Sequence, residues 1–135
     1  MPSTLTLHKN VETVRRGYQA FNSADLKTLT ELFHKDASWH VPGRSPMAGN
    51  YQGRDAVLAF FGRIGQETGG TFRAEAQHLL ADEEGRVVAI QHSSGRRGGK
   101  QLSADSCLVF QFKDGRVISG QEHYFDLYAV DAFWS

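Results

Sequence analysis

Cysteine is almost absent from the chain: its 135 residues include one, Cys107, so no disulfide can form within it and we expect a reducing compartment. No apolar run approaches the ~20 residues that a membrane-spanning helix needs, and the opening MPSTLTLHKN lacks the apolar stretch of a secretion signal. Net charge is also absent, because 15 Lys and Arg balance 15 Asp and Glu. That balance removes the electrostatic basis for binding nucleic acid or an anionic membrane. We therefore expect one soluble, cytoplasmic domain over residues 1–135.

Apolar residues are plentiful and periodic, which argues against disorder: they make up 40% of the chain, and aromatic residues make up 11%. In the first half they recur at steps of three and four, which predicts helices over residues 8–22, 24–34 and 54–68. After Gly70 the period becomes two. Strands are then expected over residues 71–81, 86–95, 100–112 and 116–126, besides a short one at 37–41. This order indicates an α+β domain in which three helices pack on a strongly curved antiparallel sheet.

Turn residues suggest how these strands align. Asp114 and Gly115 suit a two-residue type I′ turn, which needs positive φ at both positions. The resulting hairpin is expected to pair Phe112 with Val117, Asp105 with Tyr124, and Ser103 with Asp126. A second turn, centred on Arg97 and Gly98, would place His92 opposite Ser103. A slip of one residue would reverse every assignment of side chains to faces.

In this register, one sheet face has apolar residues toward one end and a polar cluster at the other, as in a ligand pocket. The cluster is His92, Ser103, Asp105, Tyr124 and Asp126. The other face is expected to be a subunit contact carrying Ser106, Gln121, His123 and Phe125. All three helices are used on the pocket side, so nothing remains to cover Phe110 and Phe125, which predicts a homodimer.

Asp126 is the main candidate for acid–base chemistry. Asp105 would be its diagonal neighbour, and two carboxylates this close raise the pKa of at least one of them, as a general base requires. His92 would lie two strands away, roughly 10 Å, where it or Tyr124 could polarise a substrate oxygen. Alternatively, these groups only satisfy one another at the open end of the sheet. Glu122 is interpreted as a buried, paired structural glutamate.

Further residues are expected to line the pocket, with a core role as the alternative for the aromatic ones: Tyr18, Trp39, Phe60, Ser103 and Tyr124. Cys107 has no histidine in its row, which argues against a nucleophilic cysteine. Of the six histidines, His92 alone shares the carboxylate face, so no metal site is predicted.

Two segments resemble a known family: WHVPG…AGNYQGRDAVLAFF (39–61) and CLVFQFKDGRVISGQEHYFDLYAVDAFW (107–134). They are similar to the SnoaL-like, ketosteroid-isomerase-related proteins of the nuclear transport factor 2-like (NTF2-like) superfamily, over about residues 10–134. The resemblance implies a cone-shaped fold, a pocket between helices and concave sheet, a dimer through the convex face, and no cofactor. Polyketide cyclases and limonene-type epoxide hydrolases of this fold use an aspartate late in the last strand, which Asp126 in HYFD matches. Epoxide hydrolases also need a pocket arginine, and His92 stands on the matching strand instead.

Two functions remain open at this point. One is a cofactor-independent enzyme that moves a proton on an apolar, carbonyl-bearing molecule, as an isomerase, cyclase or dehydratase does. The other is a non-catalytic dimeric module that binds a hydrophobic ligand, because one fold hosts many functions.

Overall fold

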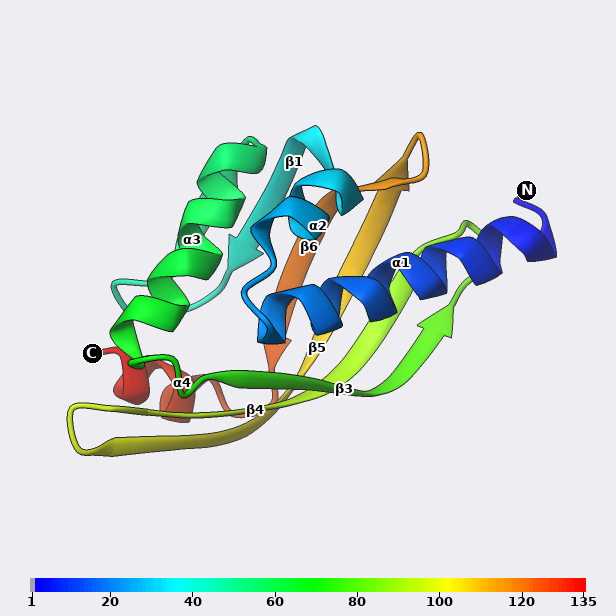
Figure 1. Cartoon of the computed structure of the whole chain (residues 1–135). Coiled ribbons are helices and arrows are strands. Elements are labelled where there is room, and N and C mark those ends of the chain that lie inside the picture. The colour runs from blue at the N-terminus through cyan, green and yellow to red at the C-terminus, as the bar shows by residue number, and fades with distance from the viewer. Residues whose placement is uncertain (1) are drawn as a thin grey trace.

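Six strands form one curved sheet, and three helices cover one of its faces (Figure 1). The computed structural model describes residues 2–135. Its helices are α1 (Thr4–Asn22), α2 (Leu26–Leu32), α3 (Arg54–Glu67) and α4 (Leu127–Trp134). Its strands are β1 (Phe33–Val41), β2 (Gly49–Gln52), β3 (Arg73–Ala81), β4 (Val87–Arg97), β5 (Lys100–Lys113) and β6 (Arg116–Tyr124). The strand order is β2-β1-β6-β5-β4-β3, with β1 parallel to β6 and the other neighbours antiparallel. The predicted α+β class is confirmed, apart from this one parallel pairing.

Capping side chains explain where the helices depart from the predicted bounds. α1 begins before residue 8 because the Ser3 hydroxyl accepts a hydrogen bond from the Thr6 amide, 3.1 Å away. α2 begins after Asp25, whose carboxylate accepts from the Thr28 amide, and it ends where β1 starts at Phe33. α4 is a fourth helix beyond the three predicted ones, and Asp126 caps it. No helix in the described residues has the length and apolar character needed to cross a membrane.

The predicted turn between β5 and β6 is confirmed. Asp114 and Gly115 have φ angles of 53° and 76°, the left-handed conformation that a type I′ turn requires at both positions. Phe112 lies opposite Val117, as expected.

A β-bulge then changes the register of this hairpin. Gln111 pairs with Ser119, so Ile118 is an extra residue in β6. Beyond the bulge Tyr124 lies opposite Ser106, and the expected pairing of Asp105 with Tyr124 is wrong by one residue. A one-residue shift moves each β6 side chain to the other face of the sheet. The β6 residues that were predicted to share a face with His92 of β4 therefore lie on the opposite face. The pairing expected for Asp126 does not form either, since β6 ends at Tyr124.

The turn between β4 and β5 is formed by Gly98 and Gly99, with φ angles of 54° and 80°. His92 consequently lies opposite Asp105 instead of Ser103. This two-residue difference keeps His92, Asp105 and Ser103 on one face, but that face is the outer one.

The inner face of the sheet contacts the helices. It carries Val87, Ala89, Gln91 and Ser93 from β4, Leu102, Ala104, Ser106, Leu108 and Phe110 from β5, and Glu122 and Tyr124 from β6. Phe110 is therefore buried in the core and not uncovered, and the predicted outer position of Ser106 is wrong. The alternation of apolar and polar residues along β4 could not identify the inner face, because both faces of VVAIQHSS (87–94) combine apolar and polar residues.

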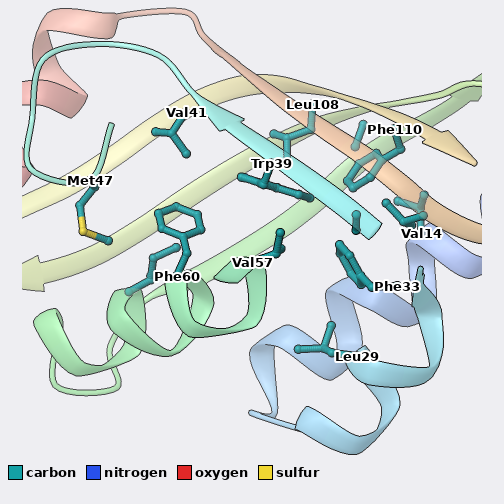
Figure 2. Close-up of a cluster of buried hydrophobic side chains, with 14 of the residues drawn as sticks. Val14, Leu29, Phe33, Trp39, Val41, Met47, Val57, Phe60, Leu108 and Phe110 are labelled. Atoms are coloured by element: carbon teal, nitrogen blue, oxygen red, sulfur yellow. The ribbon is translucent and has the colours of Figure 1, made fainter. Parts of the chain in front are cut away.

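Trp39 of β1 lies in the middle of the aromatic core (Figure 2). Its ring makes edge contacts with Phe61 and Phe110, at centroid distances of 5.0 and 5.7 Å. Gly120 of β6 permits this position, because a Cβ atom there would overlap the indole ring. The indole is thereby held close enough to β6 to reach Glu122.

Candidate active site

A partly open cavity of about 80 Å³ lies between the helices and the inner face of the sheet. Its walls are mostly apolar and come from α1, α2, α3 and the sheet, with Leu29, Phe33, Phe61 and Phe110 among them. A smaller cavity of about 30 Å³ lies toward α4, against Met47 and Trp134 among others. Three residues line both cavities: Ile64, Phe72 and Glu122. Among all the lining residues of the two cavities, Glu122 is the one carboxylate.

Glu122 is buried and held by two hydrogen bonds. Its residue is 8% exposed. The Trp39 Nε1–H donates to Oε2 over 2.7 Å, and the Tyr124 hydroxyl donates to Oε1 over 2.9 Å. Burial raises the pKa of the Glu122 carboxyl, and these two hydrogen bonds offset part of that rise. The result is an oriented carboxyl group that gains a proton more readily than an exposed glutamate does.

A second hydrogen-bonded group lies across the larger cavity. The Tyr18 hydroxyl of α1 donates to Gln91 Oε1 over 2.5 Å, and Gln91 Nε2 donates to Ser93 Oγ over 2.8 Å. Burial, together with the charge of Glu122, raises the pKa of the Tyr18 and Tyr124 hydroxyls. Both hydroxyls therefore stay protonated and act as donors at any ordinary pH.

Four of the residues predicted to line the substrate site do lie in cavity walls. Tyr18 and Trp39 line the larger cavity, and Phe60 and Tyr124 line the smaller one. Their contact with a substrate stays a prediction.

The predicted polar cluster lies elsewhere. His92, Asp105 and Ser103 are on the outer face, where His92 Nδ1 is 2.8 Å from Asp105 Oδ1 and Ser103 Oγ is 3.2 Å from His92 Nε2. The His92 and Asp105 side chains are 33% and 48% exposed, and neither cavity includes any of the three residues. Their predicted position in the pocket is wrong, because the inner face of β4 is the one with Gln91.

Asp126 is also outside the cavities. It is exposed and accepts a hydrogen bond from the Ala129 amide over 3.2 Å, as the N-cap of α4. Its predicted place on the pocket face is wrong, since the chain leaves the sheet after Tyr124.

The sequence interpretation missed the inner-face polar residues Gln91, Ser93 and Ser106. The sequence carries no clear signal for them, because polar residues occur on both faces of β4 and β5, so their position is recognised only once the inner face is known. Glu122 was expected to be buried and paired, and the structure confirms both features. Within residues 2–135, no three His, Cys, Asp or Glu side chains come together as a metal site would require.

Comparison with known proteins identifies the family. The family model of the SnoaL-like domain matches residues 14–120. An uncharacterized protein of Mycobacterium tuberculosis is 30% identical over 131 residues, covering 97% of this chain and 100% of that protein. Bal32a, from a soil-derived mobile gene cassette, has a TM-score of 0.95 at 58% identity, over 96% of this chain and 99% of that one. An NTF2-like protein from Burkholderia pseudomallei has a TM-score of 0.82 at 22% identity, over 94% of this chain and 98% of that one. The chain therefore belongs to the SnoaL-like domain family and has the cone-shaped fold of the NTF2-like superfamily.

Proposed function

We propose that this protein is a cofactor-independent acid–base enzyme that moves a proton on a small, apolar, carbonyl-bearing molecule, with Glu122 as the group that carries the proton. One observation carries the proposal. A buried carboxyl with a raised pKa lines both cavities of an otherwise largely apolar interior. A carboxyl in such a place is typical of an acid–base site.

The surroundings of Glu122 suit this reaction. In its ionised form the carboxylate takes a proton from the carbon beside the ligand carbonyl, and the electrons of the broken C–H bond move into an enolate. Where the ligand also has a C=C bond beside that carbon, the electrons spread over a dienolate, and returning the proton to the far carbon of the dienolate completes an isomerisation. Throughout, the hydrogen bond from Trp39 holds the carboxyl in one orientation, and the Tyr124 hydroxyl can rotate to accept from the protonated acid.

This proposal transfers to Glu122 the acid–base role that the sequence predicted for Asp126. Asp126 is an exposed cap of α4 and lines neither cavity, so it does not face a ligand held in them. His92 and Asp105 are likewise not part of the proposed chemistry, because they lie on the outer face.

Glu122→Gln tests the proposal with little change in structure. The glutamine Oε1 can accept from Trp39 while its Nε2 donates to the Tyr124 oxygen, so both contacts remain, the second with its direction reversed. The assay is proton NMR of cyclohexanone in D2O, which follows deuterium entering the carbons beside the carbonyl. We expect the wild-type protein to accelerate this exchange and Glu122→Gln to lower the acceleration by at least ~100-fold.

Asp126→Asn is the matched control in this assay. It removes a carboxylate outside the cavities and should leave the exchange rate unchanged. A loss of exchange in Asp126→Asn, together with full exchange in Glu122→Gln, would overturn the assignment.

A non-catalytic binding module is the second candidate. It is favoured by the two hydrogen bonds that already occupy Glu122 and by the apolar walls of the larger cavity. In that case the wild-type protein binds cyclohexanone without accelerating its exchange.

The proposal includes a second copy of the chain as partner. The outer face carries a group of partly exposed apolar residues, Val88, Ile90, Cys107 and Val109, next to the exposed Leu80. Gln121 and His123 continue this face, and Phe125, 66% exposed, follows at the end of β6. Burying such a surface against an identical one would remove it from water. A reducing, cytoplasmic location for this dimer is consistent with its lone cysteine.

A further inference from the structure

Ser106 of β5 has a buried hydroxyl with nothing to bind. The residue is only 2% exposed, and its Oγ has no hydrogen-bond partner among the described residues. Buried polar atoms are nearly always paired, and an exception calls for an explanation. Ser106 lines the smaller cavity together with Glu122, so this residue borders the same interior space as the proposed proton carrier.

The neighbours of Ser106 are already engaged. It lies in one row of the inner face, between Gln91 of β4 and Tyr124 of β6. The Gln91 oxygen accepts from Tyr18 and its nitrogen donates to Ser93. The Tyr124 hydroxyl donates to Glu122. Ser106 therefore separates two hydrogen-bonded groups and belongs to neither.

We propose that the Ser106 hydroxyl is the polar anchor of the ligand, and that it donates a hydrogen bond to the carbonyl oxygen of a small cyclic ketone. This inference rests on the proposed function in placing the ligand beside Glu122. A hydroxyl offers one donor hydrogen, and a ketone oxygen accepts without requiring a donor from the protein in return. The apolar ring of the ligand then extends from the smaller cavity past Ile64, Phe72 and Glu122, which line both cavities, into the larger and largely apolar one.

The cavity also limits the size of this ligand. A cavity of roughly 150 Å³ with apolar walls holds benzene. The two cavities here measure about 80 and 30 Å³. Both are smaller than that, so even a single ring bearing one oxygen requires the apolar side chains of the walls to shift, and a polycyclic molecule would require the helices to move.

The test compares two probes that differ only at the proposed contact: cyclohexanone and methylenecyclohexane, in which a CH2 group replaces the carbonyl oxygen. Their affinities are measured by NMR titration for the wild type and for Ser106→Ala. We expect Ser106→Ala to weaken cyclohexanone binding roughly 5- to 10-fold, the effect of one lost hydrogen bond. Its affinity for methylenecyclohexane should stay within about 2-fold of the wild type, because that probe has no acceptor.

Ser103→Ala is the control, since Ser103 is on the same strand but faces outward. It should change neither affinity. Unchanged cyclohexanone binding in Ser106→Ala overturns the inference and points to a water molecule as the partner of this hydroxyl. An equal loss for both probes overturns it as well, because that pattern reports a change of cavity shape.

Glu122→Gln separates this inference from the proposed function. Suppose that Ser106→Ala weakens binding of cyclohexanone alone while Glu122→Gln retains full proton exchange. The ligand contact of Ser106 is then supported, and the catalytic role of Glu122 is wrong. If Glu122→Gln abolishes exchange while Ser106→Ala binds both probes normally, the catalytic assignment stands and the anchor fails.

Discussion

Burial of Glu122 places an ionisable group where its charged form is poorly solvated. Two donors, Trp39 and Tyr124, compensate for part of the lost hydration. The pKa of the carboxyl still lies above its ordinary value of 4.5. Proton binding is thereby stronger in the folded state than in the unfolded chain, which couples protonation to stability.

The pH dependence of unfolding should reveal this coupling. Because the folded-state pKa of Glu122 is raised, its contribution to stability is fully present below the unfolded pKa and is lost as the pH rises through the folded pKa. Glu122→Gln has no proton to lose. The free energy of unfolding of the wild type, minus that of Glu122→Gln, should therefore fall as the pH increases from 4.5 upward. Urea titrations of both proteins at a series of pH values measure this difference in the free energy of unfolding. A difference that stays constant or grows with pH would contradict the raised pKa.

At the scale of elements, helices and strands could be predicted where the sequence has a clear hydrophobic period or characteristic turn residues. Period and turn residues located every helix and strand except β2 and α4, and the Asp114-Gly115 turn formed as expected. The extra residue Ile118 carries no such signal, because its insertion depends on pairing with β5. This one bulge moves Glu122 and Tyr124 onto the face opposite His92.

The candidate site was accordingly predictable only in part. Aromatic residues such as Tyr18 and Trp39 belong to apolar stripes, which place them near the core whatever the register. Residues of the central strands depend on the register and on which face meets the helices. His92 and Asp105 were assigned to the wrong face for that reason.

α4 holds the loop that closes the smaller cavity. The Asp131 carboxylate accepts hydrogen bonds from the backbone amides of Arg44 and Ser45 over 3.0 to 3.1 Å. Two residues after Ser45 in this loop, Met47 is 2% exposed and lines the cavity. We expect the hydrogen bonds of Asp131 to the loop amides to fix the position of Met47 in the cavity wall.

Asp131→Ala should lower the free energy of unfolding by about 1–3 kcal/mol, since it leaves the two loop amides without their acceptor. Urea unfolding monitored by tryptophan fluorescence measures this loss, as Trp134 lies in the same helix. Asp36→Ala, which removes a side chain that is 65% exposed, is the matched control and should change stability by less than about 0.5 kcal/mol. Equal stabilities of the two variants would show that α4 does not anchor the loop.

At the scale of the whole molecule, one face of the sheet serves the cavity and the other is free for a partner. Light scattering should give a mass of twice the 15.0 kDa of the chain. Val109→Asp places a charge within the apolar part of the outer face and should shift the mass to that of one chain. Gln66→Asp on the exposed side of α3 is the control and should leave the mass unchanged. A wild-type mass of 15.0 kDa at micromolar concentration would contradict the proposed partner.

The central claim is that the carboxyl of Glu122 takes the proton from the ligand, and the pH profile of deuterium exchange into cyclohexanone tests it most directly. The exchange rate of the wild type should rise as Glu122 ionises, with a midpoint above 4.5, and then level off. Glu122→Gln should show neither the rise nor the midpoint, although it still binds cyclohexanone. A wild-type rate that does not change with pH, or the same profile in Glu122→Gln, would show that another group moves the proton.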